Sequence, residues 1–247
     1  MADNSTVNNK PHFFLGATGQ SEAYTSPASG GGAGAVTPPQ VRTTHSQNLL
    51  NDLASVNSEL EIQKEEAVSY ELESKLGIQV AFESFDGVDM VVESLANATQ
   101  GIELLNVKRV SEKVIATVFI PDGKLNFFEK KIQTYIEYKT NKNDKPIDNQ
   151  KLIDAIQSFR VAALESLWSD DESLFPQDET ENVWWEVWLP VLDDRQAVLH
   201  DFTVIATEIG IEVNTGQLNF PERTVINVCG CKQQFSASTL LLSNISE

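Results

Sequence analysis

The feature that most limits the folds open to this chain is an order of elements that occurs twice. In each copy, a strand pattern is followed by a helix pattern, two more strand patterns and a second helix pattern. The second strand opens with Gly101-Ile102-Glu103 in the first copy and with Gly210-Ile211-Glu212 in the second. A repeated strand-helix-strand-strand-helix unit predicts antiparallel sheets with helices on one face, and therefore an α+β fold of two ferredoxin-like units.

The first unit is read from alternation and from helical spacing of its apolar residues. Its expected elements are a strand at 78–82, a helix at 88–96, strands at 102–110 and 114–120, and a helix that carries Leu125, Phe128, Ile132 and Ile136. The second unit repeats this order with a strand at 186–191, a helix at 198–209, strands from Gly210 and at 224–228, and a final helix at 235–245. A ferredoxin-like unit ends on one more strand. In the second unit that strand would begin just past Glu247, so we expect either a longer chain or a sheet that something else completes.

The whole chain divides into five expected segments. They are a flexible Gly/Ser/Pro leader at 1–42, an amphipathic helical segment at 43–76, the first unit at 77–140, a linking helix (149–168) with an acidic loop at 141–182, and the second unit at 183–247, which lacks its last strand. In the leader, Phe13, Phe14 and Leu15 form a short apolar patch that is a candidate protein-binding anchor. In the next segment, Leu49, Leu50, Leu53, Val56 and Leu60 form one stripe, which is more often a packing face than a partner site.

The charge and the apolar pattern exclude several classes of partner. The formal net charge is −18, and a surface this acidic repels the phosphate backbone of nucleic acids. The chain has no apolar run long enough to cross a membrane and no basic-then-apolar start typical of a secretion signal. Two cysteines in 247 residues do not form a disulfide scaffold, so we expect a cytoplasmic protein.

No stretch of the sequence predicts a catalytic, cofactor or metal site. Gly16-Ala17-Thr18-Gly19 lacks the Gly-Lys-Ser/Thr of a phosphate loop. Cys229-Gly230-Cys231 offers two thiols, but tetrahedral zinc needs two more ligands, and the three histidines are scattered. The acidic residues at 165–182 lack the glycine and the alternation of a calcium loop. A Ser-His-Asp triad with a recognisable context is also missing. We therefore expect no catalytic residue and no cofactor.

The least ordinary feature is the segment Trp184-Trp185-Glu186-Val187-Trp188. In a strand, Trp184 and Trp188 share one face with Glu186, whereas Trp185 lies on the other face. Two interpretations remain open. The tryptophans cap the sheet as core residues, which we favour for Trp185, or Trp184 and Trp188 form a protein-binding surface, because tryptophan is enriched at interface hot spots.

Several segments taken together resemble the N-terminal region of one group of bacterial subtilisin-like serine peptidases, whose genes commonly neighbour an AAA-type ATPase. The segments that carry the resemblance follow the order of that family: 12–15, 22–27, 30–32, 101–107, 117–125, 128–131, 162–168, 184–189 and 219–225. They cover almost the whole chain. The Asp, His-Gly-Thr-His and Gly-Thr-Ser segments of the peptidase family have no counterpart here, so no catalytic residue is carried over.

The resemblance implies a role in a proteolytic system without catalysis by this chain. The favoured hypothesis is a prodomain-like module that assists the folding of a subtilase catalytic domain, or inhibits it, in cis or in trans. The alternative is an adaptor that docks the peptidase to a partner AAA-type ATPase, for example in anti-phage defence. A free-standing enzyme is the third hypothesis, and it would need a pocket of polar side chains that the sequence does not predict.

Overall fold

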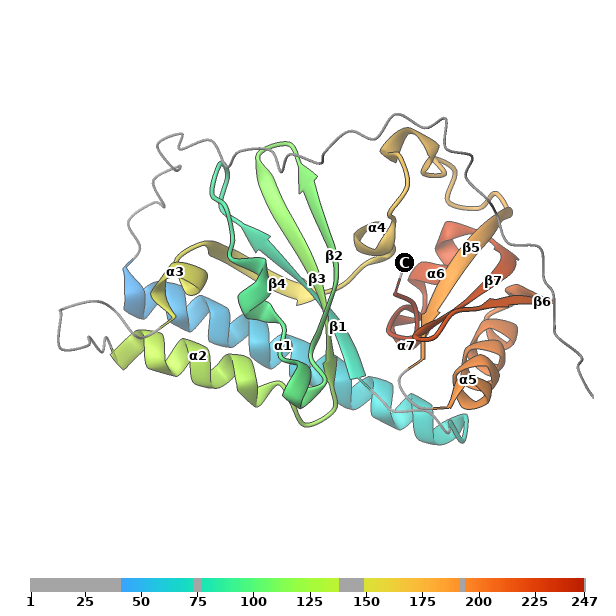
Figure 1. The fold of residues 1–247 in the computed structure, drawn as a ribbon, viewed down its shortest axis with the longest axis horizontal. Helices are drawn as coiled ribbons and strands as arrows, with labels where there is room; N and C mark the ends of the chain where they lie inside the picture. Colours follow the sequence, from blue (N-terminus) through green and yellow to red (C-terminus); the bar gives the residue numbers. More distant parts are fainter. Residues whose placement is uncertain (1–40, 73–76, 138–148, 192–193, 247) are drawn as a thin grey trace, which may run out of the picture. The chain divides into compact units, whose positions relative to one another are not determined.

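The structure is a computed structural model that describes residues 41–72, 77–137, 149–191 and 194–246 (Figure 1). Within these residues the chain is a mixed α+β protein with two antiparallel sheets. One sheet has four strands in the order β2-β3-β1-β4, and the other has three strands in the order β5-β7-β6. The predicted α+β class with two ferredoxin-like sheets is confirmed.

The first sheet has the complete set of strands that a ferredoxin-like unit requires. Its strands are β1 (Gly77–Ser84), β2 (Glu103–Val110), β3 (Lys113–Pro121) and β4 (Ile156–Val161). Strand β1 is paired on both sides, with β3 and with β4, and both pairings are antiparallel. Because β1 lies inside the sheet, nearly all of its side chains are buried, as expected for a central strand.

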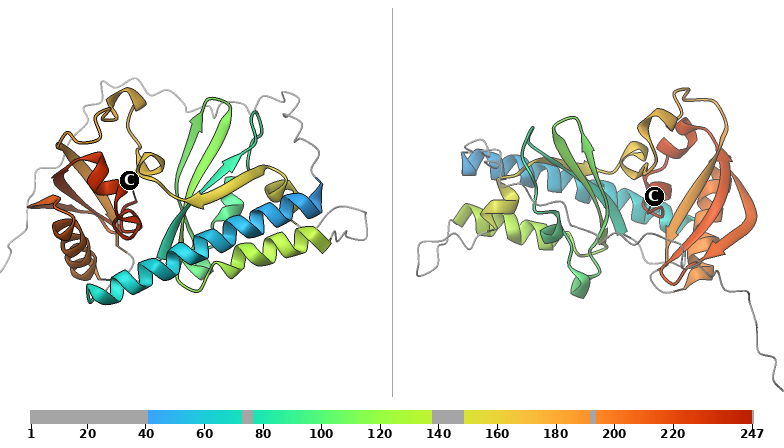
Figure 2. Two further views of the ribbon diagram at one scale, coloured as in Figure 1. Left: turned by 180° about the vertical axis from the view of Figure 1, so that it is seen from behind. Right: turned by 45° about the horizontal axis from the view of Figure 1, so that its top comes forward.

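Two helices cover this sheet. Helix α1 (Arg42–Ser69) contacts α2 (Asn126–Glu137) and β4, and Figure 2 shows the two helices side by side. Leu49, Leu53, Val56 and Leu60 of the predicted stripe are buried, and Leu50 is half-buried against the same core. The prediction that the stripe is a packing face is therefore confirmed. Helix α1 therefore belongs to the core of the first unit and does not stand apart from it.

The helix predicted at 88–96 is wrong. Those residues contain only one short 3-10 helix, η1 (Val92–Leu95), and a second, η2 (Ala98–Gln100), follows it. Three β-branched valines, Val88, Val91 and Val92, weaken the helical propensity of this segment. Because α1 packs beside α2, the sheet is covered without a helix between β1 and β2.

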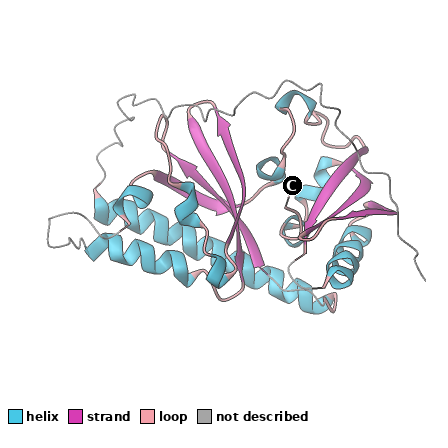
Figure 3. Ribbon diagram, in the orientation of Figure 1, coloured by secondary structure: helices cyan, strands magenta, loops and turns pink. Residues whose placement is uncertain are grey.

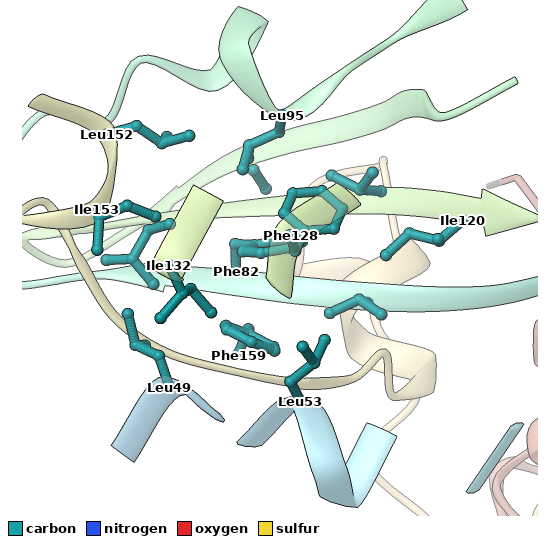
Figure 4. Close-up of a cluster of buried hydrophobic side chains, with 14 of the residues drawn as sticks. Leu49, Leu53, Phe82, Leu95, Ile120, Phe128, Ile132, Leu152, Ile153 and Phe159 are labelled. Atoms are coloured by element: carbon teal, nitrogen blue, oxygen red, sulfur yellow. The ribbon is translucent and has the colours of Figure 1, made fainter. Parts of the chain in front are cut away.

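Aromatic residues from three elements meet in the first core (Figure 4). The ring of Phe82 on β1 lies 4.9 Å from that of Phe128 on α2 and 5.0 Å from that of Phe159 on β4, measured between centroids. Leu49, Leu53 and Ile132 join the same cluster from the helices. These contacts hold α1, α2 and β4 on one sheet.

The linking helix predicted at 149–168 is the largest error. The structure has α3 (Gln150–Ile153), strand β4 and α4 (Leu164–Leu167) in its place. Ile156 and Phe159 are spaced as on a helix, yet both are buried from a strand whose register against β1 shifts between Glu83 and Ser84. Pairing with β1 decides the structure of this segment, because tertiary contacts override local spacing.

The second sheet repeats the first unit up to its third strand. It consists of β5 (Val183–Pro190), β6 (Glu212–Asn219) and β7 (Arg223–Gly230), with α5 (Arg195–Glu208) between β5 and β6 (Figure 3). The final helix predicted at 235–245 is wrong as one element, because it is divided into α6 (Lys232–Ser236) and α7 (Thr239–Leu242). Ser238 starts α7, since its side chain accepts a hydrogen bond from the Leu241 N–H.

None of the helices in the described ranges is both long enough and apolar enough to cross a membrane.

Candidate interaction surface on the second sheet

Strand β5 divides its tryptophans between the two faces of the sheet. Trp185, Val187 and Leu189 are buried, and Trp185 is only 7% exposed. Trp184 is 58% exposed on the opposite face, which it shares with Glu186 and Trp188. The prediction that Trp185 belongs to the core is confirmed.

Trp185 is fixed in an aromatic cluster. Its indole N–H donates to the Gly230 carbonyl at 2.9 Å. Its ring lies 5.1 Å from that of Phe235 and 6.0 Å from that of Trp168. A buried indole normally finds such an acceptor, and the paired rings add packing energy, so Trp185 is a rigid support for the rest of β5.

On the outer face, Trp188 stacks on Phe220. The ring centroids are 5.5 Å apart and the planes differ by 9°. Register explains the pairing: Trp188 lies opposite Val225 on β7, and Val225 lies opposite Leu218 on β6. Leu218 is 64% exposed and Phe220 is 46% exposed. We call Trp188, Leu218 and Phe220 the aromatic patch, and Trp184 lies four residues from it along β5.

The aromatic patch carries one acidic group at its border. The Trp188 indole N–H donates to Glu186 Oε1 at 2.9 Å. This bond orients the indole over the outer face and keeps the carboxylate beside it. The surface is therefore apolar with an adjacent negative charge, a combination that suits a partner with aliphatic and basic side chains.

A small cavity lies beside β5, lined by residues of both faces of the strand. Its volume is about 100 Å³. Its apolar lining residues lie in or next to α4, on β5 and in the C-terminal segment: Leu164, Leu167, Trp168, Trp185, Val187, Trp188, Phe235 and Ile245. Asp170 and Glu186 also border it. Most of its lining residues are therefore apolar, with Asp170 and Glu186 beside them.

His45 on α1 is a buried histidine, and its contacts are structural. Its Nε2–H donates to the Ile156 carbonyl at 2.8 Å, and its Nδ1 lies 3.4 Å from the Tyr135 hydroxyl. The Tyr135 hydroxyl in turn donates to Asp154. This chain of bonds connects α1, α2 and the segment that enters β4, so it fixes how the helices pack on the first sheet.

The remaining candidates from the sequence are placed as follows. Cys229 is half-buried on β7 and Cys231 is buried at the start of α6; both are free thiols. Within the described ranges, no three His, Cys, Asp or Glu side chains come together as a metal site would require. Phe13, Phe14 and Leu15 lie outside the described residues.

The sequence reasoning missed Phe220. It follows β6 in the turn to β7, and only the pairing of three strands brings it beside Trp188. Because Phe220 precedes Pro221, the local sequence predicts only a turn at this position and gives no indication of a binding surface.

Residues 43–163 match the family model of the Y4kK N-terminal domain. This part of the chain is similar to that domain, and the match runs from the first turn of α1 to just beyond β4. It therefore includes the long helix and the fourth strand of the first sheet. No curated protein and no solved structure matches the chain.

Proposed function

We propose that this chain is a non-catalytic protein-binding module that assists the folding of a subtilisin-like serine endopeptidase domain or regulates it. The observation that carries the proposal is that two segments distant in the sequence lie side by side in the fold. Residues 184–189 and 219–225, which both resemble the peptidase family's N-terminal region, are far apart in the sequence. They form one surface through the Trp188–Phe220 stack. A surface built from such segments is the natural place for contact with the peptidase domain.

The chemistry of this surface also supports the proposal. Trp188 and Phe220 are large, partly exposed rings on a rigid sheet, and such residues dominate binding energy at protein interfaces. The sheet beneath them is held by Trp185, so little ordering is required when a partner binds. A prodomain that guides folding needs a preformed surface of this type.

The test combines this chain with the catalytic domain of a subtilisin-like peptidase from the group that its sequence resembles. The refolding yield of that domain and its rate of peptide hydrolysis are measured with and without the chain. We expect a higher yield, or slower hydrolysis, and loss of either effect in Trp188→Ala and Phe220→Ala. Val68→Ala is the control, because Val68 is also an exposed apolar residue but lies on α1. Equal activity and yield in all samples would contradict the proposal.

The adaptor hypothesis uses the same surface. The Leu49–Leu60 stripe is buried against the first sheet and is not free to bind an ATPase. Among the described residues, the aromatic patch is therefore the remaining candidate for contact with the ATPase. Capture of an AAA-type ATPase from the same peptidase group that depends on Trp188, with no effect on the peptidase domain, would favour the adaptor.

A further inference from the structure

Strand β6 forms one edge of the second sheet, and two of its residues direct their backbone groups away from the sheet. The Phe220 N–H donates to the Arg223 carbonyl at 2.9 Å, so the backbone groups of Phe220 point toward β7. Successive residues of a strand point their backbone groups to alternate sides. The N–H and C=O groups of Leu218 therefore also point toward β7, and those of Gln217 and Asn219 point outward. In the described part of the chain, no strand pairs with this side of β6.

The β6 edge has a counterpart in the first sheet. The strand orders β2-β3-β1 and β6-β7-β5 correspond, so β6 takes the place of β2, the outermost strand of its unit. The strand that completes the first sheet, β4, lies beside β1 at the opposite edge. A further strand beside β5 would therefore leave the β6 edge unchanged.

The two corresponding edges differ in charge. Strand β2 carries Glu103, Lys108 and Arg109, whereas residues 213–221, from β6 into its turn, have no charged side chain. Charged side chains on an edge strand, lysine above all, keep it from pairing with another strand. Two copies of a chain with a net charge of −18 repel each other, so an uncharged segment is where they can approach most closely.

A second copy of the chain fits this edge in a symmetric register. A two-fold axis perpendicular to the sheet at Leu218 places the two Leu218 residues opposite each other, and Gln217 opposite Asn219 of the other copy. Each Gln217–Asn219 pair then exchanges both of its N–H···O bonds. An axis at Asn219 would pair Gln217 with Pro221, which has no N–H. An axis at Gln217 would involve the irregular part of β6 that follows Val213.

The side chains of the outer face agree with the register centred on Leu218. Leu218 is 64% exposed, and at the axis it meets its counterpart in a non-hydrogen-bonded pair, with about 4.5 Å between the Cα atoms. Gly216 lies opposite Phe220 of the second copy. A Cβ atom added to Gly216 would meet only the Asn214 side-chain oxygen within 4 Å, so the glycine leaves room for the ring. An aromatic ring across from an edge glycine is one of the devices that fix strand register.

We propose that this chain forms a two-fold symmetric dimer through its β6 edges, which joins the two three-stranded sheets into one continuous sheet. Leu218 lies on the axis, and the aromatic patches of the two copies meet across it on the same face. Because the paired segment is short, the dimer is weak, with a dissociation constant between the micromolar and the millimolar range. The proposal does not depend on a peptidase partner, since the chain alone provides both surfaces.

Sedimentation equilibrium of the full-length chain at increasing concentration measures the dimer. We expect Leu218→Lys to weaken the dimer at least about tenfold, because two like charges meet at the axis, and Leu218→Ile to keep it. Leu218 is exposed, so both variants should keep the fold. Val68→Lys is the matched control, because it adds the same charge at an exposed apolar position on α1 and should leave the dimer intact.

Hydrogen exchange tests the strand pairing residue by residue. The N–H groups of Gln217 and Asn219 become bonded only in the dimer, so their exchange with solvent should slow as the protein concentration rises. The Leu218 N–H points toward β7 in the monomer and in the dimer, so it is the internal control. Exchange of Gln217 and Asn219 that does not change with concentration would show that the β6 edge stays unpaired.

Cysteine cross-linking tests the register. Two variants are made in a Cys229→Ser background, which removes the half-buried native thiol. Leu218→Cys places two thiols at the axis, and we expect a covalent dimer on mild oxidation. Gln217→Cys is the control, because Gln217 residues of the two copies are diagonal neighbours about 7–8 Å apart, beyond the reach of an unstrained disulfide. Equal cross-linking of both variants would overturn the register.

The outcome for the chain alone is separate from the outcome for the proposed function. A chain that stays monomeric into the millimolar range would overturn the dimer. A dimer that Leu218→Lys leaves intact would overturn it too, because that dimer would form through another surface. Neither result bears on the contact with a peptidase domain, which is measured with that domain present and depends on Trp188.

Discussion

The indole of Trp188 lies nearly parallel to the ring of Phe220, with 5.5 Å between the centroids. Trp188 lies on β5, and Phe220 lies in the turn that joins β6 to β7. In the sheet, β7 lies between β5 and β6. Beneath them, Val225 on β7 is only 5% exposed although it faces outward. The stack therefore covers the middle strand of the sheet from its outer side.

The stack should contribute measurably to stability. We expect Trp188→Ala and Phe220→Ala each to lower the free energy of unfolding, because each exposes Val225 and removes a ring pair. In a double-mutant cycle the coupling energy should be about 0.5–1.5 kcal/mol, the range for aromatic pairs. Urea unfolding of the four proteins provides the measurement. A coupling energy near zero would mean that the rings do not interact in solution.

The fourth strand of the first sheet gives the next prediction. Phe159 is buried against Phe82, whereas its neighbour Arg160 is largely exposed beside Glu83. We expect Phe159→Ala to cost about 3–5 kcal/mol, as for other buried phenylalanines. Arg160→Ala should cost less than about 1 kcal/mol, because an exposed ion pair contributes little. Similar losses for both variants in chemical unfolding would contradict the placement of β4.

The strands that alternate cleanly could be predicted from the sequence, and the segment around Phe159 could not. The predicted strands at 78–82, 102–110 and 114–120 correspond to β1, β2 and β3, since local alternation and sheet pairing agree there. At 156–161 they disagree. Glu83 and Ser84 on β1 lie opposite Ser158 and Ile156, so Gln157 is an extra residue in β4, and Ile156 and Phe159 can both be buried from one strand. Only the partner strand reveals this.

The candidate surface shows the same limit. Trp184 and Trp188 could be placed together by the two-residue period of a strand. Phe220 could not, because its contact with Trp188 depends on a three-strand register that includes an irregularity in β6 between Val213 and Gln217. The cavity beside β5 depends on α4, which replaces part of a predicted long helix.

Close packing at the start of β1 makes Gly77 sensitive to substitution. A Cβ atom at this position would overlap the ring of Phe119 and approach the Ile120 carbonyl oxygen to 2.9 Å. We expect Gly77→Ala to destabilise the protein by about 1–3 kcal/mol, the usual cost of overpacking. Gly216→Ala is the matched control, because its Cβ would approach a single Asn214 side-chain oxygen at 3.4 Å. Thermal unfolding of both variants gives the comparison. If Gly216→Ala lowers the unfolding temperature as much as Gly77→Ala does, the overlap with Phe119 is relieved in the folded protein and the prediction is wrong.

Asp52 supplies a prediction about pH. Its carboxylate on α1 accepts a hydrogen bond from the Phe159 N–H at 3.1 Å. Burial raises the pKa of Asp52 above its ordinary value, and the bond from Phe159 opposes this in part. The folded protein therefore holds this proton more tightly than the unfolded chain. The stabilising contribution of the protonated form is complete below the unfolded pKa and is lost as the pH rises through the folded pKa.

Asp52→Asn isolates this effect, because the amide oxygen still accepts from Phe159 but carries no charge. We expect the variant to gain stability relative to the wild type as the pH is raised from about 3 to 7, across the ordinary aspartate pKa. Urea unfolding of both proteins along this pH series gives the difference directly. Glu65→Gln on the exposed face of the same helix is the control for a general change in net charge. If the difference between Asp52→Asn and the wild type is flat with pH, or falls, then burial does not set the pKa of Asp52, and the packing of α1 against β4 is looser than described.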